Sequence, residues 1–248
     1  MRIAALDTAT RATATAVADV APGEAAGVVG GIEFAVERYR EAPAGGRPGH
    51  AIELLGALEE VLQAAGGPQA AGGGWDRVDR IAVGIGPGTF TGLRIGVASA
   101  QALARSSGIP LVGVSSLHAL GLGAQKLSGP AILALIDARR GEVFAAGWPA
   151  GGDLLQAPLQ PEPVVLAPEQ LQEHAGRGSV AVGDGAIKFR AVLEQLGVVV
   201  PPDDQPVHRV SAINHCRLAA ALDPAPRPQD VQPAYLRIPD AEIAQSRR

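Results

Sequence analysis

The chain has 248 residues, 47% of them hydrophobic, so it is long enough for one large or two small α/β domains with buried cores. Its formal net charge of −4, with no run of lysine and arginine, argues against an RNA-binding domain that acts alone. The single cysteine, Cys216, excludes an intramolecular disulfide framework and suits a reducing compartment. The sequence shows neither a membrane-spanning run nor a signal peptide, so we expect a cytoplasmic protein with no membrane contact.

The first part of the chain has the pattern of three strands followed by a helix. Apolar runs and alternation predict strands over residues 2–7, 13–20 and 27–37, with a turn after the first strand. A polar loop over residues 40–49 then leads to a helix over residues 50–65. The apolar positions of this helix form one stripe, at 51, 54, 55, 58, 61, 62 and 65.

A glycine loop separates the next strand, over residues 80–85, from a helix of small apolar residues over 91–105. This helix is expected to begin at Thr89 or Thr91, where a hydroxyl can cap the first turn. We assign the loop a structural role, with glycine permitting positive φ or close approach and proline fixing the bend. It consists of Gly86, Pro87, Gly88, Thr89, Phe90, Thr91 and Gly92. Neither the glycine spacing of a dinucleotide-binding motif nor the lysine of a P-loop is present.

The second half of the chain predicts another set of strands and helices. Strands are expected over 111–114, 131–137, 142–148 and 180–183, helices over 115–126 and 186–196, and an irregular proline-rich link over 157–168. Ser211 should cap a last helix that ends at Leu222, and residues 223–233 should form an extended strap.

This order of elements predicts an α/β protein with two ribonuclease-H-like subdomains. The first would span residues 1–108 and hold the partner interface. The second, a degenerate copy, would span 109–208. Residues 209–248 would form the C-terminal helix and strap and pack back on the first subdomain.

Six short segments, in chain order, carry a resemblance to a known family. They lie at residues 6–10, 86–96, 113–117, 137–143, 183–185 and 233–237, and the most specific is Gly86-Pro87-Gly88-Thr89-Phe90-Thr91-Gly92-Leu93-Arg94. Together they resemble the bacterial TsaB family, also called YeaZ. The resemblance implies the fold of actin, sugar kinases and chaperone ATPases. It also implies a complex with TsaD and TsaE that makes N6-threonylcarbamoyladenosine next to the anticodon of tRNAs reading codons that begin with A.

The sequence offers no convincing catalytic residue or metal ligand. In the related subunit TsaD, the resemblance implies two metal-binding histidines at positions that hold Ser116 and Leu120 in this chain. Ser115 or Ser116 is better explained as a helix cap than as a nucleophile. The adjacent His215 and Cys216 point in different directions on a helix and cannot form a dyad. We therefore predict a non-catalytic scaffold. An active metalloprotease-like protein or nucleotide-dependent transferase of the same fold is the alternative.

The turn after the first strand resembles the phosphate-binding hairpin of nucleotide-binding relatives. Ala9 replaces the glycine of that hairpin, so a vestigial phosphate site formed by Asp7, Thr8 and Thr10 is favoured over a working one. We expect no tightly bound cofactor, with ATP or ADP at the interface of the complex as the remaining option. For His50, before the next helix, a cap or interface role outweighs catalysis.

The helix over 91–105 has a narrow polar face and small apolar residues on most of its circumference. A helix of this kind is either buried inside the domain or meets a second body. The resemblance favours a partner, with this helix and the helix over 50–65 side by side. That partner is TsaD, in a heterodimer that TsaE joins, or a second copy of the chain when it is alone. We expect tRNA to reach the chain only through the complex. The predicted interface residues are Leu54, Leu58, Arg94, Ile95, Ala98, Ala102 and Arg105.

Overall fold

The computed structural model describes residues 1–22, 29–43, 45–66, 74–125, 127, 131–151, 154–155, 163–173 and 176–237. Four predicted features therefore lie partly outside the described residues. They are the start of the third strand at residue 27, the end of the helix at residue 126, the first half of the link over 157–168, and residues 238–248.

The first sheet has five strands in the order β3-β2-β1-β4-β5. Its strands are β1 (Arg2–Asp7), β2 (Ala12–Pro22), β3 (Val29–Glu41), β4 (Arg80–Gly86) and β5 (Leu111–Ser115). The first three pair antiparallel, whereas β1, β4 and β5 pair parallel, which is the ribonuclease-H-type arrangement. β3 continues four residues beyond its predicted end. Because β5 joins this sheet, the predicted boundary after residue 108 falls too early.

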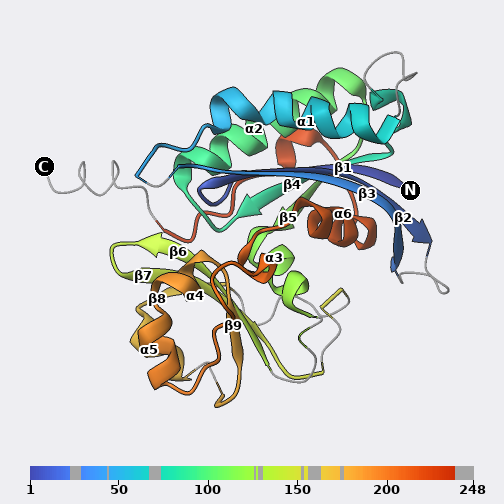
Figure 1. Ribbon diagram of the computed structural model, residues 1–248. Coiled ribbons are helices and arrows are strands. Elements are labelled where there is room, and N and C mark those ends of the chain that lie inside the picture. The colour runs from blue at the N-terminus through green and yellow to red at the C-terminus, as the bar shows by residue number, and fades with distance from the viewer. Residues whose placement is uncertain are drawn as a thin grey trace, which may run out of the picture.

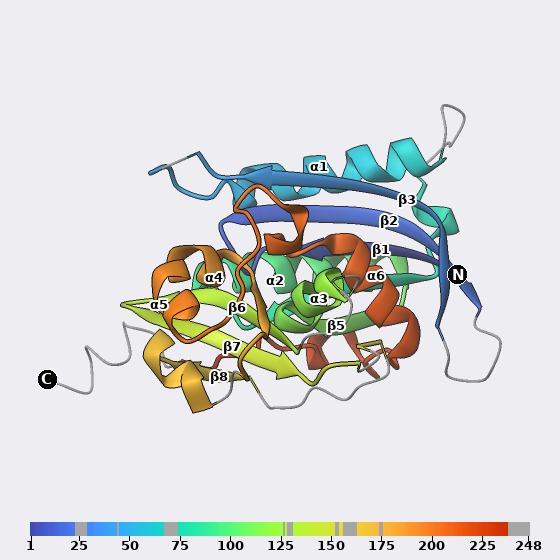
Figure 2. The ribbon, with the colours of Figure 1, turned by 60° about the horizontal axis from the view of Figure 1, so that its bottom comes forward.

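Helices cover both faces of the first sheet (Figure 1). α1 (His50–Gly66) and α2 (Phe90–Ser107) pack on one face, and α6 (Ala212–Ala221) packs on the other, beside α3 (Ser116–Ala124). Figure 2 shows α3 and α6 on the side of the first sheet that faces the second sheet. One apolar core lies under α1 and α2, and a second, rich in alanine, lies between the sheets around α3 and α6.

Among the described residues, the second sheet has four strands, which repeat the order of the first four strands of the first sheet. Its strands are β6 (Ile132–Arg139), β7 (Glu142–Trp148), β8 (Val164–Leu166) and β9 (Val180–Val182), in the order β8-β7-β6-β9. β6 pairs antiparallel with β7 and parallel with β9, as β1 pairs with β2 and β4. The two ribonuclease-H-like units predicted from the sequence are therefore present, the second one degenerate.

Two predictions for the second unit need correction. The link over 157–168 contains the short strand β8, because its valines add an antiparallel edge to β7. The predicted helix over 186–196 is two helices, α4 (Asp184–Lys188) and α5 (Arg190–Gln195). The break falls at Phe189, whose backbone leaves helical geometry while its side chain packs against the apolar core of this sheet.

After α6 the chain forms a strap that returns to the first sheet. Backbone N–H groups of Ala225 and Ala234 donate to the carbonyls of Leu111 and Ile85, at 2.9 and 2.8 Å. The side chain of Gln101 on α2 also donates to the carbonyl of Val231. The strap is extended as predicted except for one 3₁₀ turn at Pro228–Asp230.

The N-terminus of α6 is capped by a residue from another element. Ser211 occupies the N-cap position, but its hydroxyl makes no capping hydrogen bond and instead donates to Glu37 Oε1 at 2.8 Å. The same carboxylate oxygen accepts the N–H of Ile213 at 3.2 Å. Glu37 of β3 therefore does what the sequence predicted for Ser211, since an anion suits the N-terminus of a helix.

Candidate functional site

The turn between β1 and β2 is buried under the glycine loop. Asp7 is 1% exposed, and Thr8 and Thr10 are also buried. The backbone N–H of Thr89 donates to the carbonyl of Ala9, and the hydroxyl of Thr8 donates to the carbonyl of Gly92, both at 2.7 Å. Two predicted features that are far apart in the sequence, the phosphate-type turn and the structural loop, therefore form one packed unit.

Glycine is needed where the loop meets the turn. A Cβ on Gly92 would lie 2.0 Å from the carbonyl oxygen of Thr8, and one on Gly88 would lie 2.3 Å from that of Ala9. Gly86 has a φ of +101° and precedes Pro87 through a cis peptide bond. Thr89 occupies the N-cap position of α2 without a side-chain capping bond, so its expected hydroxyl cap is absent. Phe90 begins the helix and Thr91 follows on its exposed side.

The carboxylate of Asp7 has partners on both oxygens. Oδ1 accepts the N–H of Ala9 at 2.8 Å, and Oδ2 accepts the hydroxyl of Ser116 at 2.6 Å and lies 3.0 Å from Nε2 of His215. Burial acts to raise the pKa of Asp7, but the contacts with His215, Ser116 and Ala9 outweigh burial and hold this pKa below its ordinary value. Asp7 therefore joins β1, α3 and α6 inside the molecule and presents no carboxylate oxygen to solvent.

His50 ties the start of α1 to the same turn. Its Nδ1 lies 2.8 Å from the hydroxyl of Thr13, and its Nε2 lies 3.2 Å from the carbonyl of Thr10. The side chain is buried, and burial lowers its pKa. This position anchors the helix and leaves His50 without access to a substrate.

The residues weighed as hydrolase groups all have structural partners. Ser115 caps α3 by accepting the N–H of His118 at 3.3 Å. The thiol of Cys216 donates to the carbonyl of Ile3, while His215 contacts Asp7, so the two neighbours diverge as predicted. Leu120 is buried in the core between the sheets. Within the described ranges, no group of three or more His, Cys, Asp or Glu side chains is placed to hold a metal ion.

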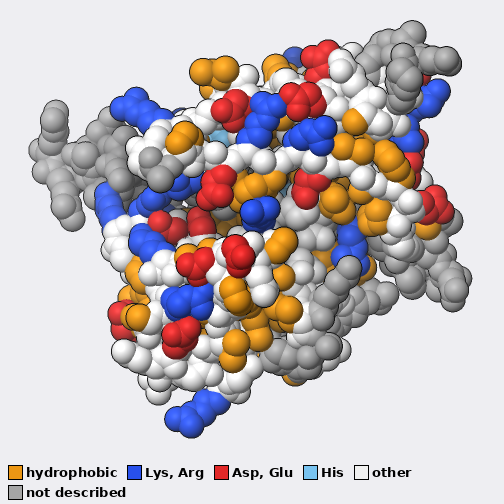
Figure 3. Space-filling view, viewed as in Figure 1, with side chains coloured by type: hydrophobic (Ala, Val, Ile, Leu, Met, Phe, Trp, Pro, Cys, Tyr) orange, Lys and Arg blue, Asp and Glu red, His pale blue; other side chains and the backbone are white. Residues whose placement is uncertain are grey.

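The predicted interface residues separate into two groups. Arg94, Ala98, Ala102 and Arg105 are exposed along α2, and Ile95 is half-buried. Leu54 and Leu58 are 2% and 1% exposed and belong to the core under α1, so their assignment to the interface is wrong. The apolar stripe on α1 faces the sheet, because a helix over a sheet must bury one face. The large apolar side chains exposed on α1 are Ile52 and Leu55, at 90% and 59%, and Figure 3 shows hydrophobic side chains at the upper edge over α1.

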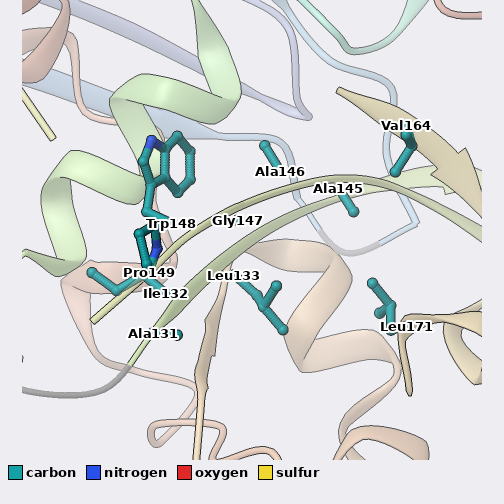
Figure 4. A pocket seen from close by; sticks show the side chains of 10 residues that line it. All are labelled: Ala131, Ile132, Leu133, Ala145, Ala146, Gly147, Trp148, Pro149, Val164 and Leu171. Atoms are coloured by element: carbon teal, nitrogen blue, oxygen red, sulfur yellow. The ribbon is translucent and has the colours of Figure 1, made fainter. Parts of the chain in front are cut away.

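A cavity of about 350 Å³ opens on the second sheet beside β6, β7 and β8. All of its lining residues are apolar or glycine: Ala131, Ile132, Leu133, Ala145, Ala146, Gly147, Trp148, Pro149, Val164 and Leu171. In Figure 4 the ring of Trp148 points away from Leu133 and Leu171. The described lining thus offers no titratable or nucleophilic side chain for chemistry.

Comparisons with known proteins match a TsaD family model and proteins named TsaB or YeaZ. The model of the family "TsaD: tRNA N6-adenosine threonylcarbamoyltransferase" matches residues 42–162. "tRNA threonylcarbamoyladenosine biosynthesis protein TsaB" of Escherichia coli (strain K12) is 32% identical over 158 residues, which cover 61% of this chain and 64% of that protein. An uncharacterised protein of Mycobacterium tuberculosis (strain ATCC 25618 / H37Rv) is 35% identical over 170 residues, 66% of this chain and 67% of that one. The solved structure of YeaZ from Pseudomonas aeruginosa has 27% identity and a TM-score of 0.72, and the match covers 95% of this chain and 99% of that chain. The chain belongs to the TsaB (YeaZ) family.

For this TsaB-family chain, sequence reasoning missed the contacts that join distant segments. Ser116 was interpreted as a helix cap rather than a nucleophile, and His215 was weighed as a base beside Cys216, whereas both contact Asp7. The signal that was available is their polarity at positions on helices that are otherwise apolar, because a buried polar side chain needs a partner. No feature of the sequence indicated that Glu37 would cap α6.

No described helix has the length and apolar character that a membrane crossing requires.

Proposed function

We propose that this chain is the non-catalytic scaffold subunit of the bacterial complex with TsaD and TsaE. That complex transfers threonylcarbamoyl from threonylcarbamoyl-AMP to N6 of the adenosine 3′ to the anticodon, in tRNAs that read codons beginning with A. We place it in the cytoplasm, where it would meet tRNA only in the complex. The printed name of the E. coli relative, a tRNA threonylcarbamoyladenosine biosynthesis protein, supports the pathway.

The observation that carries the scaffold role is the closed Asp7–Thr10 turn. A phosphate bound by this turn would need its backbone groups and a free carboxylate or metal nearby. In this chain the N–H of Ala9 donates to Asp7 Oδ1, the hydroxyl of Thr8 donates to the carbonyl of Gly92, and Asp7 also contacts Ser116 and His215. These contacts favour a vestigial site formed by Asp7, Thr8 and Thr10. On this proposal the chain alone binds no nucleotide tightly, and ATP or ADP binds only where the partner completes a site.

The surface offered to a partner lies on α1 and α2. Ile52 and Leu55 of α1 and Ala98 and Ala102 of α2 are exposed, and the two helices are in contact. Small residues on α2 allow another helix to approach closely. We propose that TsaD docks here, and that a second copy of the chain takes its place when TsaD is absent.

The test of this surface is a pair of charged substitutions. Ala98→Glu and Ala102→Glu would each bury an unpaired carboxylate in the complex, and we expect at least tenfold weaker TsaD binding, about 1.4 kcal/mol. Because both positions are exposed in the free chain, its melting temperature should barely move. Ala191→Glu on the exposed side of α5 is the matched control and should change neither quantity. Wild-type affinity for TsaD in both variants would refute this docking surface.

A modification assay separates the scaffold from the alternative, an active metalloprotease-like or nucleotide-dependent enzyme. The purified chain should form no threonylcarbamoyladenosine, and adding TsaD, TsaE and threonylcarbamoyl-AMP should restore the reaction. Modification by the chain alone, or stoichiometric zinc or iron in the purified chain, would favour the enzyme.

A further inference from the structure

Three of the segments that carry the family resemblance meet at one place on the surface. They are the glycine loop with the start of α2, the turn between β6 and β7, and the end of the C-terminal strap. We use the term three-motif surface for Phe90, Arg94, Arg139, Arg140 and Tyr235. None of these residues contributes to the buried turn or has a proposed catalytic role, and of the five only Arg94 was among the predicted interface residues.

The first contact joins α2 to the strap. The guanidinium carbon of Arg94 lies 3.8 Å from the centroid of the Phe90 ring, and the rings of Phe90 and Tyr235 are 5.0 Å apart. Arg94 Nε donates to the hydroxyl of Tyr235 at 3.2 Å. The two rings, which are tilted by 38° to each other, and the guanidinium thus contact one another at the surface, where Tyr235 remains exposed.

The second contact joins the strap to the other sheet. Arg237, two residues after Tyr235, donates through Nη1 to the carbonyl of Ala138 at 2.9 Å, and its Nη2 lies 2.7 Å from Glu142 Oε2. These atoms flank the β6–β7 turn. The strap therefore fixes the turn next to Phe90 and Arg94, although the turn and α2 belong to different sheets.

The turn itself is held in an unusual conformation. Arg139 and Arg140 have φ values of +65° and +52°, a region that glycine and asparagine adopt more readily than arginine. Two successive arginines in this conformation carry a backbone cost, although the side chain of Arg139 also lies 3.4 Å from the carboxylate of Asp137. Backbone strain of this kind gathers where function requires a particular side chain.

The charge that reaches solvent here is positive. The side chain of Arg139 is 52% exposed and lies 3.4 Å from the carboxylate of Asp137, which is only 10% exposed and also contacts Lys188, while Arg94 and Arg140 are also exposed. Figure 3 shows Lys and Arg side chains gathered at the left edge, on the side of the β6–β7 turn and the C-terminal end of the described chain. A chain with a net charge of −4 thus presents a local cationic surface assembled from segments far apart in sequence.

We propose that the three-motif surface binds the RNA substrate in the assembled complex, its arginines contacting backbone phosphates and Tyr235 stacking on an unpaired base. Guanidinium groups match phosphate oxygens in geometry as well as charge. An aromatic ring beside exposed arginines is the usual platform for bases in RNA loops. An acidic protein segment could form ion pairs with the arginines, but it would not need the exposed ring of Tyr235. The proposal rests on the proposed function, because that function supplies an RNA with an unpaired anticodon loop.

The test uses the complex of the full chain with TsaD and a fluorescently labelled, unmodified tRNA transcript whose anticodon reads a codon beginning with A. The key variant is Arg139→Asn with Arg140→Asn, because asparagine suits positive φ and the turn should keep its shape. We expect at least tenfold weaker tRNA binding, with a melting temperature that is unchanged or higher. The slope of log affinity against log salt should lose roughly 1.5 units, since two phosphate contacts are removed. Tyr235→Ala should weaken binding about fivefold without changing this slope, as loss of one stacking contact does.

The matched control is Arg177→Asn with Arg227→Asn, two exposed arginines outside the surface. Wild-type affinity and slope in the Arg139–Arg140 variant would overturn the inference. So would weaker TsaD binding in that variant, which would make the surface a protein-docking face. Failure of the proposed function has a different signature, because the wild-type complex would then leave the tRNA unmodified whatever its binding affinity.

Discussion

The hydroxyl of Ser116 donates to Oδ2 of Asp7 at 2.6 Å, although 109 positions separate these residues in the chain. The bond links the end of β1 to the start of α3, the helix between the two sheets. The same oxygen lies 3.0 Å from Nε2 of His215 on α6. A carboxylate that would manage a metal or water in a nucleotide-binding relative is thus the point where three elements of the fold are joined.

Asp7→Asn should destabilise the chain strongly. The substitution removes a buried carboxylate that accepts a hydrogen bond from Ser116 and contacts His215; because hydrogen bonds to a charged group contribute about 1.5–3 kcal/mol, the free energy of unfolding in urea should fall by that order. Asp19→Asn, which breaks a half-exposed pair with Arg2, should cost about 0–1 kcal/mol and serves as the control. If both variants lost the same free energy of unfolding, the buried carboxylate of Asp7 would stabilise the fold no more than that of Asp19.

The contacts of Asp7 also make the stability of the folded chain depend on pH in a defined direction. Because the pKa of Asp7 in the folded chain lies below its ordinary value of 3.8, the unfolded chain takes up this proton first as pH falls. The contribution of Asp7 is therefore complete above about pH 4 and is lost in more acid solution. Unfolding free energies of wild type and Asp7→Asn, measured from pH 6 down to pH 3, should converge.

His50 should make the chain less stable at mildly acid pH. Burial holds its pKa below the ordinary value of 6.5, so the unfolded chain binds a proton in a range where the folded chain does not. Stability should then fall as pH drops below 6.5. His50→Gln should flatten this part of the curve in urea unfolding at pH 7.5 and 5.5. A curve of unchanged steepness would show that His50 is not kept neutral by the fold.

Two helical glycines should respond in opposite ways to alanine. Gly92→Ala places a Cβ against the carbonyl of Thr8 and should cost about 1–3 kcal/mol through overpacking. Gly56→Ala in α1 meets nothing within 4 Å and should raise stability by about 0.5–1 kcal/mol through helix propensity. Thermal unfolding of both variants checks the pair. If both variants shifted the melting temperature in the same direction, the glycine loop would not pack on the turn as tightly as in the structure.

Leu55 and Leu58 lie within one turn of α1, but Leu55 is exposed on the proposed partner surface, whereas Leu58 lies in the core. Leu58→Ala should cost about 2–5 kcal/mol, because this side chain is fully buried. Leu55→Ala should change the stability of the free chain by no more than about 0.5 kcal/mol, since Leu55 is mostly exposed, yet it should weaken TsaD binding. Affinity and unfolding measured on both variants test the assignment, which a stability loss at Leu55 would contradict.

The sequence predicted most elements because their patterns are local. The alternation in β2 and the stripe on α1 each indicate the element that forms, and the glycine loop marks the boundary between β4 and α2. The sequence pattern does not show which face of α1 packs on the sheet. Leu54 and Leu58 were therefore assigned to the partner interface, although both face the sheet. The place of β5 was also misjudged, because a parallel strand is joined to its sheet by a long connection that leaves no local signal.

The site was less predictable than the fold because its contacts link residues far apart. Asp7, Ser116 and His215 come from three elements, and nothing within any one segment indicates that the three side chains meet. The segments that carry the resemblance did include the residues of the three-motif surface. Their meeting point depends on the path of the strap, which proline-rich composition alone does not determine.

The strap and the Asp7 cluster have a consequence for motion. Proteins that close around a ligand do so by hinge movement between two bodies. In this chain Arg237 fastens the β6–β7 turn to a strap held by β4, β5 and α2, while Ser116 and His215 fasten α3 and α6 to β1. Any hinge opening between the sheets would have to break bonds at both places. The two sheets are therefore expected to move together as one body.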